Sequence, residues 1–246
     1  MKKLLIFLLT FLPLISFCQN YDAPNANKIA IGLTYSPDYC YRTIKTDTSR
    51  QWLADLRNND EIPKYGYTAG LNLALNFNKR FAIEVGLLLS DKGEKTKKYN
   101  LIGNQPDPDL PTKITFISHL LYLDIPIKVN YFILTRRTKL FVLAGVSPSV
   151  FLTQKTTSIA EYSDGSTKTN TSSGASGFSK INLTFIAGFG VSYDLTKTIT
   201  LKIEPTYRRS ITPISNALVK EYLYSMGLNT GFFFNFKSRK GKWGHK

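Results

Sequence analysis

Apolar and polar residues alternate along eight segments of the chain. In the clearest segment, residues 198–209, Ile199, Leu201, Ile203 and Tyr207 fall on one face, and charged or hydroxyl side chains fall on the other. Successive residues of a strand point to opposite faces, so the pattern predicts strands with one apolar face and one polar face. The eight predicted strands are Lys28–Tyr35, Tyr65–Phe77, Arg80–Ser90, Thr115–Phe132, Lys139–Leu152, Asn182–Tyr193, Thr198–Arg209 and Tyr222–Phe236.

The connections between these strands alternate strictly between short and long. The short ones are Asn78–Lys79, Thr135–Thr138 and Asp194–Lys197, and the long ones are Ser36–Lys64, Asp91–Ile114, Thr153–Ile181 and Ser210–Glu221. Outer-membrane barrels pair short periplasmic turns with longer extracellular loops, and bacterial single-chain barrels have an even number of strands. The sequence therefore predicts an all-β fold, an eight-stranded antiparallel up-and-down transmembrane β-barrel with long extracellular loops. Both mature termini are predicted to be periplasmic.

Two of the segments need interpretation. Pro126 lies inside a predicted strand, where it cannot donate a ladder hydrogen bond, so it predicts a bulge or a skipped bond. In 139–152 both phases carry apolar residues. We assign the even-numbered residues to the lipid face, which leaves Gly145, Ser147 and Ser149 inside.

The N-terminal residues predict export. Lys2 and Lys3 precede the apolar run Leu4–Phe17, and a small residue-x-small residue site ends at Cys18. Residues 1–18 are therefore interpreted as a signal peptide that is cleaved after Cys18, with residues 19–236 as the barrel domain. The alternative is a lipoprotein in which Cys18 is lipidated. No later segment has about 18 consecutive apolar residues, which excludes a helical inner-membrane protein.

The chain is strongly basic, with a formal net charge of +15, which falls to +13 when Lys2 and Lys3 are removed with the signal peptide. Such a surplus favours anionic neighbours. For an exported protein these are outer-membrane lipid and lipopolysaccharide, and nucleic acid is not expected. Cys40 is the only cysteine of the mature chain, so neither an intrachain disulfide nor a CxxC metal site is predicted, and no cofactor is expected.

Several stretches of the sequence resemble the PorT-like outer-membrane β-barrel proteins of Gram-negative bacteria. The resemblance covers most of the mature chain. It rests on the stretches Tyr122–Lys128, Leu143–Pro148 and Gly188–Tyr193 and on the aromatic closing strand. It implies an integral outer-membrane protein and, for the namesake of the family, a role in protein secretion and gliding.

Six charged side chains fall on the inward phase of the predicted strands, namely Glu84, Asp124, Lys128, Lys202, Glu204 and Arg208. An eight-stranded barrel encloses little more than its own side chains. Because unpaired charge in such a space is costly, these residues predict an interior salt-bridge network that fills the barrel. A narrow ion path or a binding pocket is the alternative, and a wide pore is not expected.

A lipid-modifying barrel enzyme is the second function class. Its candidate residue is His119, which is in phase with the lipid-facing residues near the outer end of its strand. A hydrolase would need a nucleophile and a carboxylate within hydrogen-bond reach of the imidazole. The adjacent Ser118 points to the opposite face and does not meet that need. We therefore expect no catalytic residues and no enzyme.

The long loops and the tail are the regions where binding function is expected. One predicted loop contains four lysines close together in the sequence, Lys92, Lys95, Lys97 and Lys98. They are candidates for contact with lipopolysaccharide phosphates. Residues 49–60 predict a short helix with Trp52, Leu53 and Leu56 on one side, and residues 153–179 predict a mobile polar loop. Residues 237–246 form a basic periplasmic tail.

The sequence thus predicts an outer-membrane barrel with a structural, binding or assembly role and an envelope or secretion protein as partner. The lipid-modifying enzyme that uses His119, resembling a lipid A deacylase, is kept as the alternative. A soluble lipocalin-like barrel would need an apolar interior and a polar exterior. The charged residues on the inward phase of 80–90, 115–132 and 198–209 argue against that arrangement.

Overall fold

The computed structural model describes residues 29–101, 110–174, 177–215 and 219–236. The predicted signal peptide 1–18 and the predicted tail 237–246 lie outside these residues. Within them no helix is long and apolar enough to cross a membrane. Nearly all of the described chain is antiparallel β-structure.

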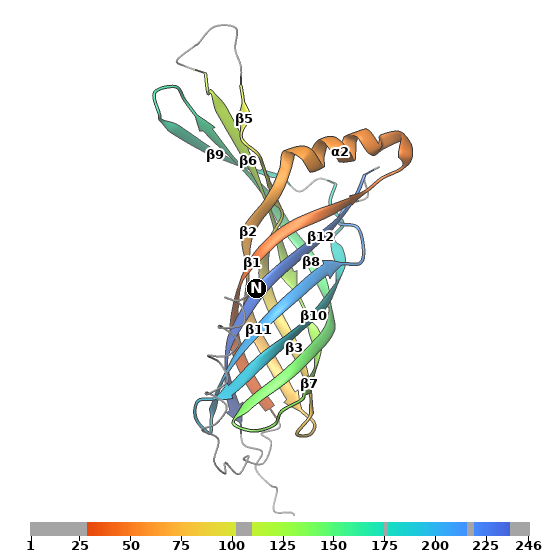
Figure 1. Cartoon of the computed structure of the whole chain (residues 1–246), viewed down its shortest axis with the longest axis vertical. Coiled ribbons are helices and arrows are strands. Elements are labelled where there is room, and N and C mark those ends of the chain that lie inside the picture. Colours follow the sequence, from red (N-terminus) through yellow and green to blue (C-terminus); the bar gives the residue numbers. More distant parts are fainter. Residues whose placement is uncertain (1–28, 102–109, 175–176, 216–218, 237–246) are drawn as a thin grey trace, which may run out of the picture.

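The sheet contains twelve strands and closes on itself, because β1 pairs with both β12 and β2. The strands are β1 (Ile29–Lys45), β2 (Glu61–Asn76), β3 (Phe81–Lys92), β4 (Glu94–Thr96), β5 (Tyr99–Asn100), β6 (Lys113–Asp124), β7 (Ile127–Phe132), β8 (Thr138–Glu161), β9 (Thr167–Gly174), β10 (Ile181–Asp194), β11 (Ile199–Ser210) and β12 (Lys220–Phe236). Going round the closed wall from β1, the order is β12, β11, β10, β8, then β7 and β6, then β3 and β2. The remaining strands β4, β5 and β9 lie beyond one end of the wall (Figure 1).

The alternation read from the sequence explains which side chains face outward. Along β1 the residues from Ile29 to Tyr39 alternate between exposed and buried without interruption, and β10 and β12 follow the same alternation over most of their length. The exposed positions are apolar, including Leu33, Leu71, Phe189 and Phe232. In β8 the even-numbered Leu140, Val142 and Val146 are exposed, as the sequence predicted.

Two features make the observed strand count differ from the predicted eight. The predicted strand Thr115–Phe132 is divided into β6 and β7 at Pro126. Its pairing register with β3 and with β8 is the same on both sides of the break, so Pro126 skips ladder bonds without a bulge. The register shift in this region lies instead at Leu121/Tyr122.

The second feature is a set of additional short strands. They are β4, which pairs with β2 and β6, and the strands of a sheet that protrudes beyond the wall. We call protruding sheet the assembly of β5, β9, the first half of β6 and the second half of β8 (Figure 1). The sequence predicted loops over most of these residues, although it included 115–118 and 150–152 in predicted strands. The prediction of a mobile loop over 153–179 is wrong for 153–161 and for β9, which are paired strands. Threonine-rich segments such as 167–171 suit strands because of their branched side chains.

The end opposite the protruding sheet carries the short turns. Asn78 closes the first turn by accepting hydrogen bonds from the backbone N–H groups of Arg80 and Phe81, both at 2.8 Å. Ile29 pairs with Phe236, so both ends of the described chain lie at this rim. At the other rim, a 3-10 turn (Thr48–Arg50) leads into the helix α2 (Gln51–Asp60), close to the predicted helix 49–60.

Candidate functional site: the barrel interior and its rim

Four charged side chains from three wall strands meet in the middle of the barrel. The Nζ of Lys128 lies 2.7 Å from Glu84 Oε1 and 3.1 Å from Glu204 Oε2. The Nζ of Lys202 lies 2.8 Å from Glu84 Oε2. All four residues are buried, which is tolerable because two carboxylates face two ammonium groups and the net charge of the group is zero.

Two amides complete this central network. Asn130 donates a hydrogen bond of 3.3 Å to Glu84, and Asn229 donates one of 2.9 Å to Glu204. Both amide side chains are buried and come from β7 and β12. Each carboxylate therefore receives bonds from a charged and a neutral donor, which fixes its orientation. This is the geometry of a packed interior and not of an open ion path.

The other two charges predicted for the interior belong to separate ion pairs nearer the rim that carries α2. Asp124 accepts bonds from Lys92 and, at 2.8 Å, from Ser90. Arg208 donates a bond of 2.7 Å to Asp38. Asp38 also accepts bonds from two hydroxyl groups, those of Ser36 and Thr68. The structure thus brings all six predicted residues into the interior, in three groups.

Asp38 was missed by the sequence analysis, because it lies in the stretch predicted as a long loop. The available signal was the alternation itself, which continues past Tyr35 with inward Asp38, Cys40 and Arg42. We predicted a loop here because these inward residues are polar and the sequence does not show which residues would pair with them in the interior.

Apolar layers lie on both sides of the charged residues. Towards the short turns, Phe132, Phe141 and Phe233 are buried, and the ring centroids of Phe132 and Phe141 are 5.3 Å apart. The ammonium group of Lys202 lies 4.1 Å from the centroid of Phe233, so it bridges the aromatic layer and the central network. Towards the other rim, Leu120, Tyr122, Ile214 and Leu223 form a second apolar cluster.

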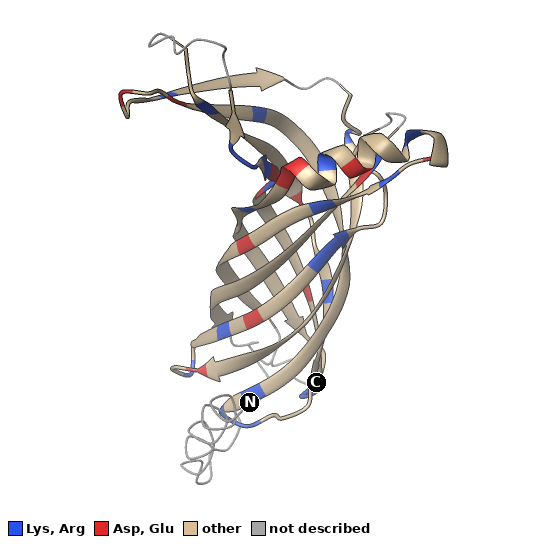
Figure 2. Ribbon diagram, turned by 45° about the horizontal axis from the view of Figure 1, so that its top comes forward, with Lys and Arg blue, Asp and Glu red and all other residues tan. Residues whose placement is uncertain are grey.

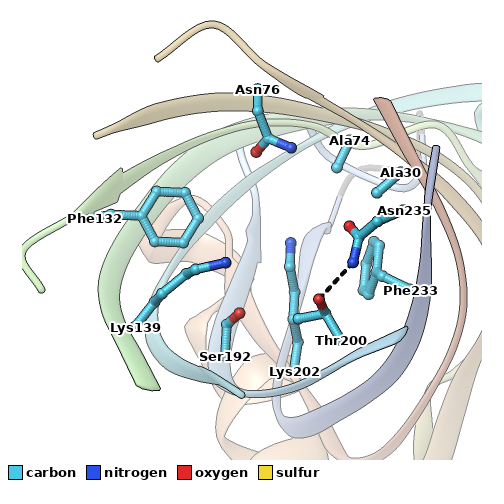
Figure 3. A pocket seen from close by; sticks show the side chains of 10 residues that line it. All are labelled: Ala30, Ala74, Asn76, Phe132, Lys139, Ser192, Thr200, Lys202, Phe233 and Asn235. Carbon is cyan, nitrogen blue, oxygen red and sulfur yellow. Dashed lines mark hydrogen bonds between the residues drawn. The ribbon is translucent and has the colours of Figure 1, made fainter. Parts of the chain in front are cut away.

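A pocket opens below the aromatic layer at the short-turn end (Figure 3). It holds about 320 Å³ of space outside the atoms, including open space at its mouth. Its lining residues are Ala30, Ala74, Asn76, Phe132, Lys139, Ser192, Thr200, Lys202, Phe233 and Asn235. Both lysines are already paired, Lys139 with Asp194 and Lys202 with Glu84. The pocket is therefore electrically compensated and suits water or a small polar group.

A network of arginines and glutamates fixes α2 to the rim on which it lies, at the end of the barrel away from the short turns. Arg57 of α2 donates a bond of 2.8 Å to Glu61 and a second bond to Glu221 of β12. Arg42 of β1 also bonds to Glu61. Glu94 of β4 lies beside this network and beyond the wall strands. Burial raises the pKa of Glu94 to about 7, and the carboxylates of Glu61 and Glu221 act in the same direction.

The four lysines predicted to contact lipopolysaccharide do not lie together. Lys92 belongs to the interior, where its Nζ is 3.0 Å from Asp124. It is therefore not available to lipid phosphates, because β3 extends two residues further than the sequence predicted. Lys98 is exposed and forms an ion pair with Glu161 of β8. Lys97 is exposed, and Lys95 of β4 pairs across the sheet with Ile117.

His119 lies on the outer face of β6 and is partly exposed. Its Nδ1 is 2.9 Å from Asp91 Oδ2 and also 2.9 Å from Lys64 Nζ. The same nitrogen can donate to the carboxylate or accept from the ammonium group, but it cannot do both. Among the described residues no serine, threonine or cysteine side chain is hydrogen-bonded to this histidine. The described residues also hold no cluster of three or more His, Cys, Asp or Glu suited to a metal ion.

A comparison with protein families identifies the type of domain. A family model described as outer membrane protein beta-barrel domain matches residues 17–216. Neisserial surface protein A is 13% identical with a TM-score of 0.48, over 85% of this chain and 97% of that one. OprG from Pseudomonas aeruginosa is 12% identical with a TM-score of 0.43, over 89% and 100%. The protease OmpT from Escherichia coli is 8% identical with a TM-score of 0.41, over 89% and 99%.

No curated protein sequence matches the chain. The three structural likenesses combine low identity with TM-scores below one half, so they carry no argument about activity.

Proposed function

This chain belongs to the outer membrane protein β-barrel domain family, and we propose that it is a transmembrane barrel that displays a binding surface outside the cell and conducts no solutes. We count eight wall strands by treating β6 and β7 as one strand interrupted at Pro126. The short turns and both mature termini face the periplasm in this proposal, and α2 and the protruding sheet face outward. The short-to-long asymmetry of the two rims supports this orientation.

The observation that carries the proposal is the protruding sheet. All eight residues of β9 are exposed, and within the described residues β9 pairs only with β8. Its second edge therefore presents backbone N–H and C=O groups to solvent. An extended segment of another protein can add to such an edge as a further strand. The proposed partner is an envelope or secretion protein that supplies such a segment.

The filled interior supports the exclusion of transport. Charged groups paired with one another lie between two apolar layers, so a permeating ion would have to displace buried partners. The first test is electrical. We expect no ion conductance when the refolded protein is inserted into planar bilayers, and a Phe132→Ala/Phe141→Ala/Phe233→Ala variant serves as the opened reference. Steady conductance of the unmodified protein would contradict the proposal.

The orientation is tested by labelling. A Thr169→Cys variant in β9 is expected to react with a membrane-impermeant maleimide on intact cells, and a Lys197→Cys variant in a short turn is expected to react only after permeabilisation. The natural Cys40 is 1% exposed and provides an internal background. The reverse pattern would invert the proposed orientation.

The partner is tested by placing a photo-crosslinking amino acid at Thr169. We expect an adduct of defined mass in intact cells. The matched control carries the same amino acid at Ile203, which is exposed on the outer face of β11. An adduct of the same mass and yield from the control position Ile203 would contradict binding at this edge.

The narrower PorT-like identity and the secretion role remain part of the proposal. Of the residues that carry the resemblance, Asp124 pairs with Lys92 in the interior and Pro126 interrupts a wall strand. These residues account for the wall of the barrel, so they support the fold and do not point to secretion. Lipopolysaccharide contact through Lys95, Lys97 and Lys98 also stands as a proposal.

A lipid-modifying enzyme is the second candidate because His119 faces Asp91 across 2.9 Å. Such a carboxylate can orient an imidazole for general-base work. We nevertheless propose that the protein is not an enzyme, since Lys64 competes for the same nitrogen. The test is the acyl pattern of lipid A from cells that carry His119→Asn. A changed pattern with normal barrel content would favour the enzyme.

A further inference from the structure

The outer surface of the wall differs between its two sides near the rim that carries α2. On β2, β1, β12 and β11 this surface is rich in tyrosine, namely Tyr39, Tyr41, Tyr65, Tyr207, Tyr222 and Tyr224. On β3, β6, β8 and β10 the described outward positions near this rim hold no tyrosine. They include the aliphatic Leu89, Leu123, Leu152 and Leu183, and Phe185 is the aromatic residue that pairs with Arg209. An aromatic girdle alone would surround the barrel. The one-sided distribution therefore points to a more specific use.

The tyrosines form neighbouring rows across the strands, which we call the tyrosine face. Tyr224 of β12 pairs with Tyr41 of β1 on one side and with Arg209 of β11 on the other. The ring centroids of Tyr41 and Tyr224 are 6.0 Å apart. In the next row, Met226 lies between Tyr39 and Tyr207. The face thus combines flat rings and hydroxyl groups with an apolar strip at Met226.

Three exposed cations lie beside the tyrosine face or between it and the rim. Lys45 and Lys220 are direct cross-strand partners and are both exposed. Two like charges in this position repel each other unless an anion lies between them. Arg209 is exposed as well, and its Nη1 lies 3.5 Å from the hydroxyl oxygen of Tyr207. In the described part of the chain none of these three cations has an acidic partner.

Some cations elsewhere near the same rim are compensated. Lys98 pairs with Glu161, and Lys64 of β2 pairs with Asp91 beside His119. Figure 2 shows how Lys and Arg lie among Asp and Glu in the ribbon. Exposed lysines without an acidic partner among the described residues also occur on the other side, such as Lys155 of β8. The tyrosine face is therefore distinguished by its combination of cations with aromatic rings and not by its lack of acidic partners.

Along the ladder between β1 and β12 the chemistry changes in a fixed order. The Lys45/Lys220 pair comes first, then Thr43/Tyr222, Tyr41/Tyr224 and Tyr39/Met226. Below them the outward residues of β12 are mostly apolar, with Leu228 and Phe232 about half exposed. The order is cationic, then aromatic and hydroxyl, then apolar, from the rim towards the middle of the wall.

We propose that the tyrosine face binds a phosphorylated glycolipid of the outer leaflet, of the lipid A class. Its phosphates would contact Lys45, Lys220 and Arg209, its sugars would lie over the tyrosine rings, and its acyl chains would follow Met226 and Leu228. Charge-assisted bonds to phosphate and amphipathic rings at the headgroup level are suited to these parts. This inference rests on the proposed membrane orientation, in which α2 lies outside.

The experiment uses the full-length protein folded in nanodiscs of zwitterionic phospholipid with added bisphosphorylated lipid A, and bound lipid is counted by native mass spectrometry. The variant Lys45→Gln/Arg209→Gln/Lys220→Gln removes three charges from the tyrosine face. The control Lys113→Gln/Lys155→Gln/Lys180→Gln removes three exposed charges that lie outside the tyrosine face and outside the group Lys95, Lys97 and Lys98. We expect at least tenfold weaker lipid A binding for the first variant and less than a twofold change for the control.

Three further probes identify the recognised group. Dephosphorylated lipid A is expected to lose most of the binding, and phosphatidylglycerol or inorganic phosphate is expected to compete poorly, because each has only part of the complementary chemistry. A heat-modifiable gel shift checks that every variant is folded. Equal losses for both triple variants, or full competition by inorganic phosphate, would overturn the specific site. These outcomes leave the conductance and labelling tests of the proposed function unaffected.

Discussion

The barrel interior and the protruding sheet are both built from antiparallel strands, yet they place polar residues in opposite environments. In the interior, Glu84 is 0% exposed and its carboxylate is bound by two lysines and an amide. In the protruding sheet, β9 is equally polar but every residue is exposed. Burial away from bulk solvent makes it costly to lose an interior partner, whereas solvent replaces any lost partner in β9. The comparison therefore separates the part that determines stability from the part that is free to change for binding.

The largest expected effect comes from breaking the central network. Glu84→Gln leaves Lys128 and Lys202 sharing the single carboxylate of Glu204, and we expect the free energy of unfolding to fall by about 4 kcal/mol. Urea unfolding of the refolded protein in detergent micelles measures this loss. The double variant Glu84→Gln/Lys202→Gln restores one-to-one pairing, so it is expected to lose less than the single variant. A double variant that is weaker than the single one would show that pairing is not the cause.

The aromatic layer is expected to give the next largest effect. Phe141 is 1% exposed and packs against Phe132, so Phe141→Ala leaves a cavity and is expected to cost about 3 kcal/mol. Phe116→Ala in the protruding sheet provides the comparison, because Phe116 is 38% exposed and is expected to cost less than about 1 kcal/mol. Equal losses at the two positions would remove the distinction between the regions.

The rim between the two regions is expected to respond to pH through Glu94. Because its pKa is raised to about 7 in the folded protein, the folded state holds a proton that the unfolded chain releases near pH 4.5. Stability at the rim is therefore greatest below pH 4.5, falls as the pH rises from 4.5 to 7, and is constant above that. Glu94→Gln is expected to remove this dependence and to stabilise the protein at pH 8 by about 3 kcal/mol.

Urea midpoints of the two proteins at pH 4, 6 and 8 provide the measurement. The midpoints are expected to coincide at pH 4 and to separate as the pH increases. A constant separation across all three values would exclude titration of Glu94 as the cause.

A matched pair of threonines gives the smallest expected effects. The hydroxyl of buried Thr68 donates to Asp38, so Thr68→Ala is expected to cost about 1 kcal/mol. Thr169 of β9 is exposed, and Thr169→Ala is expected to change stability by less than about 0.5 kcal/mol. Thermal unfolding of the two variants side by side tests the difference. A larger loss for Thr169→Ala would mean that β9 contributes to the stability of the barrel.

Much of the wall was predictable because alternation is a local property. The predicted ends of 182–193, 198–209 and 222–236 agree with β10, β11 and β12 within two residues at each end. The inward assignment of Glu84, Lys128, Lys202 and Glu204 followed from the same two-residue period. Pro126 also marked a real interruption, because the missing N–H is a covalent fact that no tertiary contact alters.

The errors arose where partners are distant in the sequence. β1 extends to Lys45 because inward Asp38 finds Arg208, which is 170 residues away along the chain. Lys92 was assigned to a loop because its partner Asp124 is contributed by another strand. In both cases a polar residue was interpreted as part of a loop. In the structure it is paired with an interior residue that is distant in the sequence.

By itself, the sequence determined the strand period, the apolar outer face and the inward charges, since each depends only on the identity of neighbouring residues. The tertiary structure alone decided which charges pair, that Phe132, Phe141 and Phe233 close the interior, and that β9 joins β8 beyond the rim. Closure of the sheet brings residues together from all parts of the chain. The energies of buried ion pairs and packed rings depend on those distances and not on the order of the residues.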